Sequence, residues 1–302
     1  MDALKLFIRL SRPVFLIIGF LCYTLGAGIA KYLGVNIDWG LYWLGQSWVS
    51  VTQLSGIYFY EYFNPNIESE NPNSTPLSRN FNLPSSISSL LRQIILIAFA
   101  TCLTGMVTLS IVLFRGYHPT GLVILLMIGV IIGSFLYSAP PIRLVTSGYG
   151  ELTITFLVAV LLPVYGFVLQ KGELHRLLAM TTFPLFALHL AMMISLELPH
   201  YASDLKHDRN VFLVRVGWQR SMLIHNLLIL CAFLILSLAL IFGMPYKIGL
   251  PVFLVLPLGL LQIWQMRRIA DGHKPDWTLL TSVAVFLFGS TVYLLSYSFW
   301  IR

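Results

Sequence analysis

The chain has 302 residues, of which 57% are hydrophobic and only 10% charged, with a net charge of +7 and a mean hydropathy of +0.81. Soluble domains of this size carry about 25% charged residues, so the composition excludes an ordinary soluble protein and predicts one that lies in a lipid bilayer. A β-barrel is disfavoured, because its strands would alternate in hydrophobicity, whereas the apolar residues here form continuous runs.

Nine apolar runs are long enough, at about twenty residues, to cross a bilayer as helices. Short polar connections separate most of them, so the sequence predicts an all-α integral membrane protein with a single domain over residues 1–302. The first run is longer than the apolar part of a signal peptide and lacks a convincing cleavage site, so we expect it to stay as the first helix. The predicted spans are 14–34, 41–63, 89–114, 120–138, 152–170, 177–198, 222–243, 247–264 and 277–299.

The distribution of lysine and arginine predicts the orientation of these spans. With the N-terminus in the cytoplasm, 13 of the 19 basic residues fall in cytoplasmic segments and 6 in outer ones. We therefore predict a multi-pass protein of the cell (inner, cytoplasmic) membrane. The positive charge then reflects this bias and attraction to anionic lipid, and no nucleic-acid partner is predicted. Cys22, Cys102 and Cys231 fall within spans and are expected to be packed thiols, not disulfides.

The first of two unusually polar stretches, YFYEYFNPNIESENPNSTPLSR, covers residues 58–79 and follows the second predicted span. Helical spacing would place Glu61, Asn64 and Glu68 on one face. Tyr60, Asn64 and Glu68 would share a second face that overlaps the first. Pro65 disfavours helical geometry at the residue before it, so the helix should kink or restart there.

The second stretch, ELPHYASDLKHDRNVFLVRVG, covers residues 197–217 and follows the sixth span, which puts it on the same side of the membrane. Its carboxylates and one histidine share a helical face, and two cations lie beside them. The residues are Glu197, His200, Asp204 and Asp208, with Lys206 and Arg209 as the cations.

Oxygen ligands that converge from two helices suit Mg²⁺, which binds one or two carboxylates together with substrate phosphates, and the nearby cations would suit a diphosphate. The alternative is that these acids are simply solvated at helix ends. Glu197 lies within a span, where a carboxylate is costly and is a functional candidate by default; protonation or His200 could also neutralise it. His189, deeper in the same span, fits a hydrogen-bonded packing residue better than a ligand.

In their order and spacing, these motifs resemble the UbiA superfamily of intramembrane prenyltransferases, closest to the branch that prenylates dihydroxynaphthoate in menaquinone synthesis. The resemblance covers nearly the whole chain. SRPVFL at 11–16 is similar to the family's Arg-Pro opening of the first helix, and the two polar stretches are similar to its two Asp-rich loops. YSAPPIRL at 137–144, followed by GYGELT at 148–153, is the most specific match.

The resemblance implies a bundle of nine helices around a central cavity, in which Mg²⁺ and two Asp-rich motifs hold a prenyl diphosphate at the cytoplasmic end. Ionisation would expel pyrophosphate, and an aromatic, quinone-precursor-like acceptor would capture the allylic cation. The family's five polar motif positions fall here on Tyr60, Asn64, Glu68, His200 and Asp204, so only one aspartate is unchanged.

The resemblance therefore implies three sets of site residues. The expected catalytic residues are Asp204, Glu68 and Asn64; the expected diphosphate ligands are Arg79, Arg143, Lys206, Arg209 and Tyr137; the expected metal ligands are Asn64, Glu68, Asp204, Glu61, Asp208 and His200. With so few carboxylates, Mg²⁺ is expected to arrive with the diphosphate.

Three other functions remain open from the sequence. A relative that cyclises a prenyl diphosphate without an aromatic acceptor would need the same diphosphate site. A non-catalytic lipid- or quinone-binding protein on the same scaffold is favoured by the altered motifs. A channel or transporter is disfavoured, because the ionisable residues gather at one face of the membrane and do not line a path through it.

Overall fold

The computed structural model describes residues 10–63, 88–207 and 209–302, and every regular element in these ranges is helical. This confirms the predicted all-α class. The first helices are α2 (Pro13–Tyr32), α3 (Trp39–Phe63), α4 (Ser88–Tyr117) and α5 (Gly121–Ser138). A continuous helical stretch then runs through α6 (Gly150–Phe156), η3 (Leu157–Leu161) and α7 (Leu162–Lys171), and it is followed by the long helix α8 (Arg176–Glu197).

Shorter elements at the end of α8 carry the second polar stretch. They are η4 (Leu198–His200), α9 (Tyr201–Lys206) and α10 (Phe212–Val216). The chain ends with α11 (Trp218–Ile241), α12 (Tyr246–Gly249), η5 (Leu250–Val255), α13 (Leu256–Ala270) and α14 (Trp277–Trp300). The remaining short element, η2 (Leu144–Thr146), follows α5.

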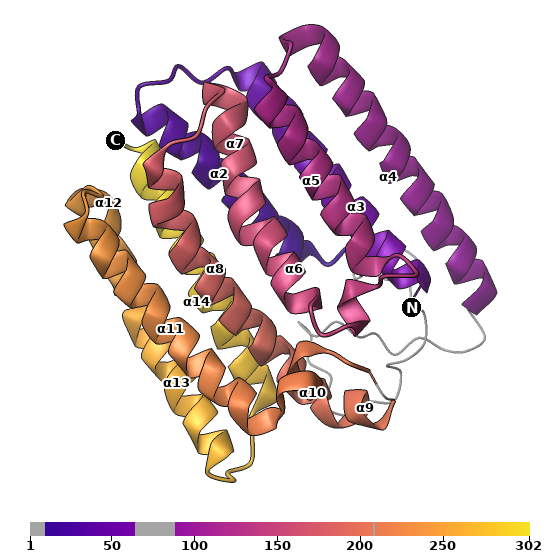
Figure 1. The fold of residues 1–302 in the computed structure, drawn as a ribbon, viewed down its shortest axis with the longest axis vertical. Helices are drawn as coiled ribbons and strands as arrows, with labels where there is room; N and C mark the ends of the chain where they lie inside the picture. The colour runs from indigo at the N-terminus through magenta and orange to yellow at the C-terminus, as the bar shows by residue number, and fades with distance from the viewer. Residues whose placement is uncertain (1–9, 64–87, 208) are drawn as a thin grey trace.

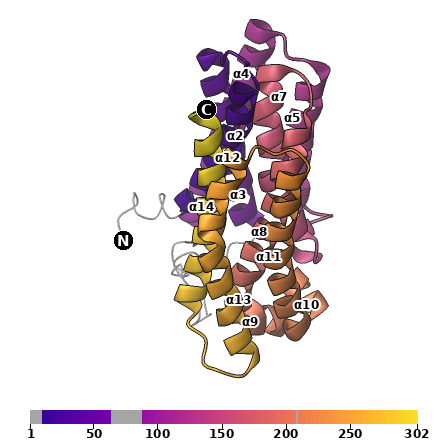
Figure 2. The same cartoon turned by 90° about the vertical axis from the view of Figure 1, so that its left-hand side faces the viewer.

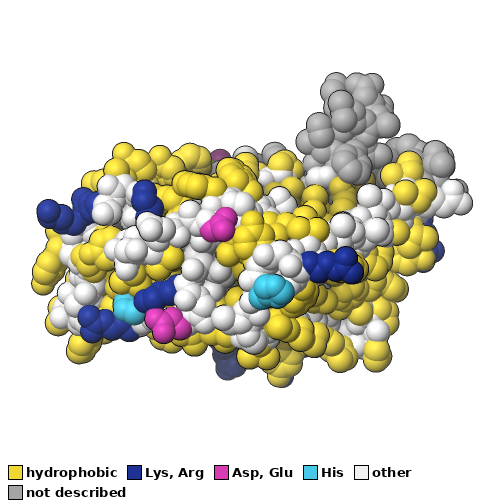
Figure 3. All heavy atoms as spheres, turned by 90° about the horizontal axis from the view of Figure 1, so that it is seen from above, with side chains coloured by type: hydrophobic (Ala, Val, Ile, Leu, Met, Phe, Trp, Pro, Cys, Tyr) yellow, Lys and Arg dark blue, Asp and Glu magenta, His cyan; other side chains and the backbone are white. Residues whose placement is uncertain are grey.

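Eight helical segments of the described ranges are long and apolar enough to cross a membrane. The second predicted span corresponds to α3, which has 25 residues but lies outside this set, because polar side chains such as Gln46, Ser50 and Gln53 lower its hydropathy. The number nine therefore stays a prediction, while a multi-pass arrangement is supported. Large apolar side chains on the outside of the bundle, such as Ile97 and Leu125, are suited to contact with lipid, and Figure 3 shows hydrophobic side chains over much of one end.

The helices form two layers (Figures 1 and 2). One layer contains α5, the α6–α7 stretch, α8 and α11, and the other contains α3, α2, α14 and α13. Helix α4 packs against α3 at one edge. Close backbone approach joins the layers where α2 crosses α7: a Cβ at Gly26 would lie 1.9 Å from the carbonyl oxygen of Pro163. Small residues permit such crossings in membrane bundles.

The α6–α7 stretch contains one turn of π-helix at η3, directly before Pro163. Proline has no backbone N–H and its ring clashes with the carbonyl four residues earlier, so regular α-helical geometry is disfavoured from Ala159 to Pro163. The wider turn accommodates this mismatch. Leu157 and Val158 of this turn face the space between the two layers.

Candidate functional site

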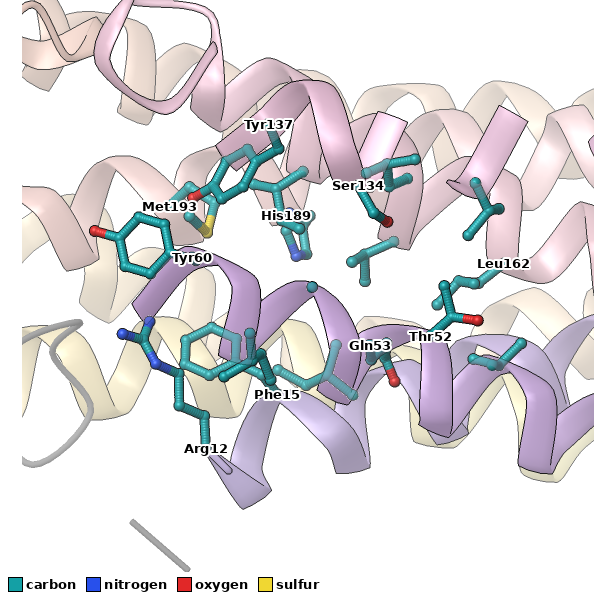
Figure 4. A pocket seen from close by; sticks show the side chains of 18 of the residues that line it. Arg12, Phe15, Thr52, Gln53, Tyr60, Ser134, Tyr137, Leu162, His189 and Met193 are labelled. Carbon is teal, nitrogen blue, oxygen red and sulfur yellow. The ribbon is translucent and has the colours of Figure 1, made fainter. Parts of the chain in front are cut away.

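A cavity of about 140 Å³ lies between the two layers. Five helical segments form its walls: α2 and α3 on one side, and α5, the α6–α7 stretch and α8 on the other (Figure 4). Most of its lining is aliphatic or aromatic, with charged side chains at one end and neutral polar side chains, including Thr52 beside Leu162, along the rest. The aliphatic and Met lining residues are Ile18, Val49, Ile57, Val130, Ile154, Leu157, Val158, Leu162, Met193 and Leu196.

His189 of α8 stands in the middle of the cavity. Its Nδ1 is 2.9 Å from the hydroxyl of Thr155 on α6, and its ring meets Phe288 of α14 edge-on with centroids 4.9 Å apart. The hydrogen bond agrees with the interpretation of His189 as a hydrogen-bonded residue, but its place in the cavity lining differs from that of a packing residue. Gln53 of α3 and Ser134 of α5 also line this part of the cavity. The middle therefore offers neutral hydrogen-bonding groups.

One end of the cavity is charged and aromatic, and we call Arg12, Tyr60, Tyr137 and Glu197 the polar end. Arg12 forms an ion pair with Glu61 and places its guanidinium 5.5 Å from the centroid of the Tyr60 ring. The rings of Tyr60 and Tyr137 have centroids 6.1 Å apart, so two neighbouring aromatic rings form part of this end. Chain segments far apart in sequence supply this end (Figure 4).

Arg12 has an unusual backbone conformation. It directly precedes Pro13, the first residue of α2, and has φ +46°. Arg143, which follows α5, has φ +41°. Residues other than glycine pay a cost in this left-handed region, and such residues cluster at functional sites. Two arginines share this conformation, one of them at the polar end.

The second polar stretch folds into a buried charged unit just beyond the polar end. Arg209 Nη1 lies 3.2 Å from Asp204 Oδ1, and the two side chains are only 6% and 2% exposed. A backbone hydrogen bond of 3.0 Å from Arg209 N to Asp204 O closes the turn around them. Glu151 of α6 accepts a 3.4 Å hydrogen bond from the backbone N–H of Phe212 and ties α6 to this stretch. Folding thus buries charges that the sequence places near a membrane surface.

The structure places the predicted site residues in different environments. Tyr137 lines the cavity, and Glu61 contacts Arg12 at its end. His200, Asp204 and Arg209 are buried nearby in the second polar stretch, whereas Lys206 is exposed at the end of α9 and Arg143 is half-buried and absent from the cavity lining. Asn64, Glu68, Arg79 and Asp208 lie outside the described residues.

Sequence reasoning left several polar residues of the cavity out of the site, among them Arg12, Gln53 and Ser134, and it interpreted His189 as a packing residue. The signal for Arg12 was present in the Arg-Pro pair that opens the first helix. Glu197, in contrast, was singled out as a carboxylate within a span, and it lines the polar end.

The described residues do not by themselves fit a magnesium site. In the described ranges, no three His, Cys, Asp or Glu side chains are grouped so that they could hold a metal ion. The carboxylates of Glu61 and Asp204 are engaged by Arg12 and Arg209, and Mg²⁺ prefers several oxygen ligands in near-octahedral geometry. A metal would need ligands from the undescribed loop or from a bound diphosphate.

The fold and site together define a multi-pass helical membrane protein with an apolar cavity that ends in buried charge. The sequence matches the UbiA prenyltransferase family over residues 78–290, and the protein belongs to this family. A comparison of the sequence with curated proteins gives no match.

Solved structures share this fold. A UbiA homologue from Archaeoglobus fulgidus bound to GPP and Mg²⁺ has a TM-score of 0.67 at 18% identity, covering 96% of this chain and 99% of the homologue. Its complex with DMAPP and Mg²⁺ gives 0.68 at 18% identity, with coverages of 96% and 98%. A structure of digeranylgeranylglyceryl phosphate synthase gives 0.59 at 15% identity, with coverages of 100% and 98%. The predicted UbiA-like fold is confirmed; the menaquinone branch stays a prediction.

Proposed function

We propose that this protein transfers a prenyl group from a prenyl diphosphate to an aromatic acceptor of the quinone-precursor kind. The observation that carries the proposal is the cavity, in which apolar walls end at Arg12, two tyrosine rings and Glu197. The proposal is also supported by membership of the UbiA prenyltransferase family and by the likeness to a homologue solved with GPP and DMAPP.

The two halves of a prenyl diphosphate match the two parts of the cavity. The hydrocarbon tail would lie against aliphatic walls, where burial of each CH₂ contributes about 0.8 kcal/mol. The diphosphate would lie at the polar end, where the planar guanidinium of Arg12 can donate two parallel hydrogen bonds to phosphate oxygens. We keep Arg79, Arg143, Lys206 and Arg209 as further proposed diphosphate ligands.

The bond that breaks joins the first prenyl carbon to a diphosphate oxygen, and the electron pair leaves with pyrophosphate. Positive charge then develops on the prenyl carbon beside Tyr60 and Tyr137, whose ring faces can stabilise a cation by about 0.5–2 kcal/mol. The apolar walls exclude water that would otherwise trap this cation. Attack by an electron-rich aromatic carbon, followed by loss of its proton, would complete the transfer.

The acceptor is proposed to bind in the middle of the cavity. His189, Gln53 and Ser134 offer neutral donors and acceptors there, which suits the hydroxyl or carbonyl groups of an aromatic acceptor. The position also lies between the polar end and the apolar walls, close to the carbon that would become reactive.

A divalent cation forms part of this proposal, because the solved homologue carries Mg²⁺ beside GPP or DMAPP. Bound with the diphosphate, it would neutralise charge on the leaving group. Two described carboxylates are engaged by arginines, so we propose that the ion arrives with the substrate and does not wait at a preformed site. The polar end is proposed to face the cytoplasm, in agreement with the distribution of basic residues.

The test is to incubate the purified protein with Mg²⁺ and prenyl diphosphates of several lengths, with and without aromatic acceptors, while measuring pyrophosphate release. The proposal expects release that depends on an acceptor, together with a prenylated product. Release without an acceptor would indicate cyclisation or hydrolysis. Absence of release with every pair would favour a non-catalytic lipid- or quinone-binding protein.

A further inference from the structure

A second group of buried polar side chains lies outside the cavity, among α8, α11, α13 and α14. It consists of Ser195, Ser221, His225, Gln262 and Gln265, which we call the polar layer. The first four are completely buried and Gln265 is 7% exposed. The polar layer is neutral throughout, in contrast to the polar end of the cavity.

Hydrogen bonds of Gln262 join α13 to α8 and α14. Gln262 Nε2 of α13 donates to Ser195 Oγ of α8 at 2.9 Å and to the carbonyl of Leu280 on α14 at 3.3 Å. Ser221, His225 and Ile229 share one face of α11 at a spacing of four residues. This face looks onto α13, because a Cβ at Gly259 would lie 3.3 Å from Ile229 Cγ2.

Helices α11 and α13 run in opposite directions, so the residues that follow Gly259 along α13 meet those that precede Ile229 along α11. Gln262 and Gln265 therefore lie at the level of His225 and Ser221. The apolar neighbours of the layer confirm this register, since Met222 of α11, Met266 of α13, Leu280 of α14 and Ile194 of α8 belong to one packed cluster.

Five buried atoms of the polar layer have no hydrogen-bond partner among the described residues: Ser221 Oγ, His225 Nε2, Gln262 Oε1, and both Oε1 and Nε2 of Gln265. Burying such a group without a partner costs about 1–3 kcal/mol. Several of them at one level of a membrane bundle would be expensive, so partners other than these side chains are expected.

The chemistry of these atoms identifies the partner. His225 Nδ1 lies 3.0 Å from Asn226 Oδ1, which can only accept, so Nδ1 carries the hydrogen and Nε2 is an acceptor. Gln262 Oε1 and Gln265 Oε1 are also acceptors, while the Ser221 hydroxyl and the Gln265 amide can donate. A ligand must therefore both donate and accept, and it needs no charge.

Space restricts this ligand to a small molecule. A Cβ at Gly259 would lie 2.9 Å from Phe233 Cε2, so α11 and α13 are closely packed one turn away from the layer. Water is small, has two donors and two acceptors, and typically forms about three hydrogen bonds when buried in a protein.

We infer that the polar layer is an internal water-binding site that stabilises α8 on the side opposite the cavity. Ser195 connects the layer to α8, while Met193 and Glu197 on the same helix line the cavity. Bound water would complete the hydrogen bonds of α11 and α13 and hold them against this wall helix. The inference does not depend on the proposed prenyl transfer.

Radiolytic footprinting of the full-length protein in lipid nanodiscs tests this site directly. A brief X-ray pulse converts bound water to hydroxyl radicals, which oxidise adjacent side chains, and mass spectrometry locates the products. Met222 and Met266 flank the layer and are only 3% and 0% exposed. Met127, which is 3% exposed within the main apolar cluster, is the internal reference.

We expect Met222 and Met266 to be oxidised several-fold more than Met127. In the variant Ser221→Ala, His225→Leu, Gln265→Leu their oxidation should fall to the level of Met127, while Ser237→Ala, which removes a hydroxyl bonded to Phe233 O on α11, should leave it unchanged. If the triple variant does not fold, Gln265→Leu alone should lower the signal. Wild-type oxidation at the Met127 level, or oxidation unchanged in folded layer variants, would overturn the inference.

Discussion

The cavity and the C-terminal bundle (α8, α11, α13 and α14) both bury polar side chains within apolar surroundings, but they bury different kinds. The polar end of the cavity and the second polar stretch beyond it hold arginine and carboxylate side chains, and the C-terminal bundle holds hydroxyls, amides and an imidazole. Charge in a membrane is costly unless it is paired or lines a polar space. The difference shows that charged side chains lie at one end of the cavity and beyond it, whereas neutral groups lie where α8, α11, α13 and α14 pack together.

Helix α8 belongs to both regions. One of its faces carries His189, Met193 and Glu197 into the cavity, while Ser195 meets the C-terminal bundle. Changes in one region should therefore differ from changes in the other both in size and in what they disturb.

The largest effect is expected at the buried ion pair. Asp204→Ala would leave Arg209 buried without this carboxylate, which should lower the free energy of unfolding by about 3–5 kcal/mol. Denaturation of the purified protein in detergent measures this loss. If the protein is active, the milder Asp204→Asn should also severely reduce turnover, because Asp204 is one of the expected catalytic residues.

A matched control is available at the opposite end of the bundle. Lys171 and Glu173 lie at the same distance of 3.2 Å, but their side chains are 23% and 69% exposed. Glu173→Ala should cost under about 1 kcal/mol. Equal losses of stability in the two variants would show that Asp204 and Arg209 are solvated, and that this end of the bundle does not bury an ion pair.

The next effect concerns the diphosphate. Arg12→Ala should weaken the binding of a prenyl diphosphate by about 1.5–3 kcal/mol, or roughly 10–100-fold, because a charge-assisted hydrogen bond at the polar end is lost. Binding of the matching prenyl alcohol should change little. Arg143→Ala should act in the same direction with a smaller effect, since Arg143 does not line the cavity.

Arg12→Lys is the control for this measurement, because it retains the charge and can still balance Glu61. Arg12→Lys should therefore be more stable than Arg12→Ala. It should restore only part of the affinity for the prenyl diphosphate, since an ammonium lacks the planar fork of a guanidinium. An equal loss of alcohol and diphosphate binding in Arg12→Ala would assign Arg12 to packing.

The sequence predicts some features of these regions better than others. The apolar runs locate the helices closely: the predicted spans 14–34, 120–138 and 277–299 correspond to α2, α5 and α14, which begin and end within two residues of the prediction. A length of about twenty apolar residues is a local signal. The π-turn at η3 has no such local signal, because it depends on how Pro163 is accommodated within a packed helix.

The site was harder to predict because its contacts join distant residues. Arg12 and Glu61 are 49 positions apart, and no local pattern pairs them. Asp204 and Arg209 are only five positions apart, and both were among the expected site residues, Asp204 on a shared helical face and Arg209 as a cation beside it. The polar layer left a weak signal in Ser221–His225 and Gln262–Gln265, which are spaced like one helix face, but only packing shows that the two faces meet.

A smaller effect is expected from the polar layer. His225→Leu and Gln265→Leu should each lower the free energy of unfolding by about 1 kcal/mol, because each removes some partners of the remaining buried groups. Combining them should cost less than the sum of the two, since a group and its water partner are removed together. Strict additivity in a double-mutant cycle would indicate that the two side chains do not share a hydrogen-bond network.

The smallest effect is expected at the other end of α8, where His175 caps the helix. Its Nδ1 accepts a hydrogen bond of 3.3 Å from the backbone N–H of Leu177, which requires a neutral imidazole.

Burial lowers the pKa of His175 from its ordinary value of 6.5, and the charges of Lys171 and Arg176 lower it further. The unfolded chain therefore binds this proton more readily than the folded protein, so stability rises with pH in this window. The contribution should be fully present above the unfolded pKa of 6.5 and should be lost as the pH falls below it. Serine caps a helix without titrating, so His175→Ser should unfold with a flatter pH dependence than the wild type, by a margin well below the effect of Asp204→Ala. Thermal melts over a pH series measure both slopes, and identical slopes would show that the imidazole does not hold this end of the helix that the two regions share.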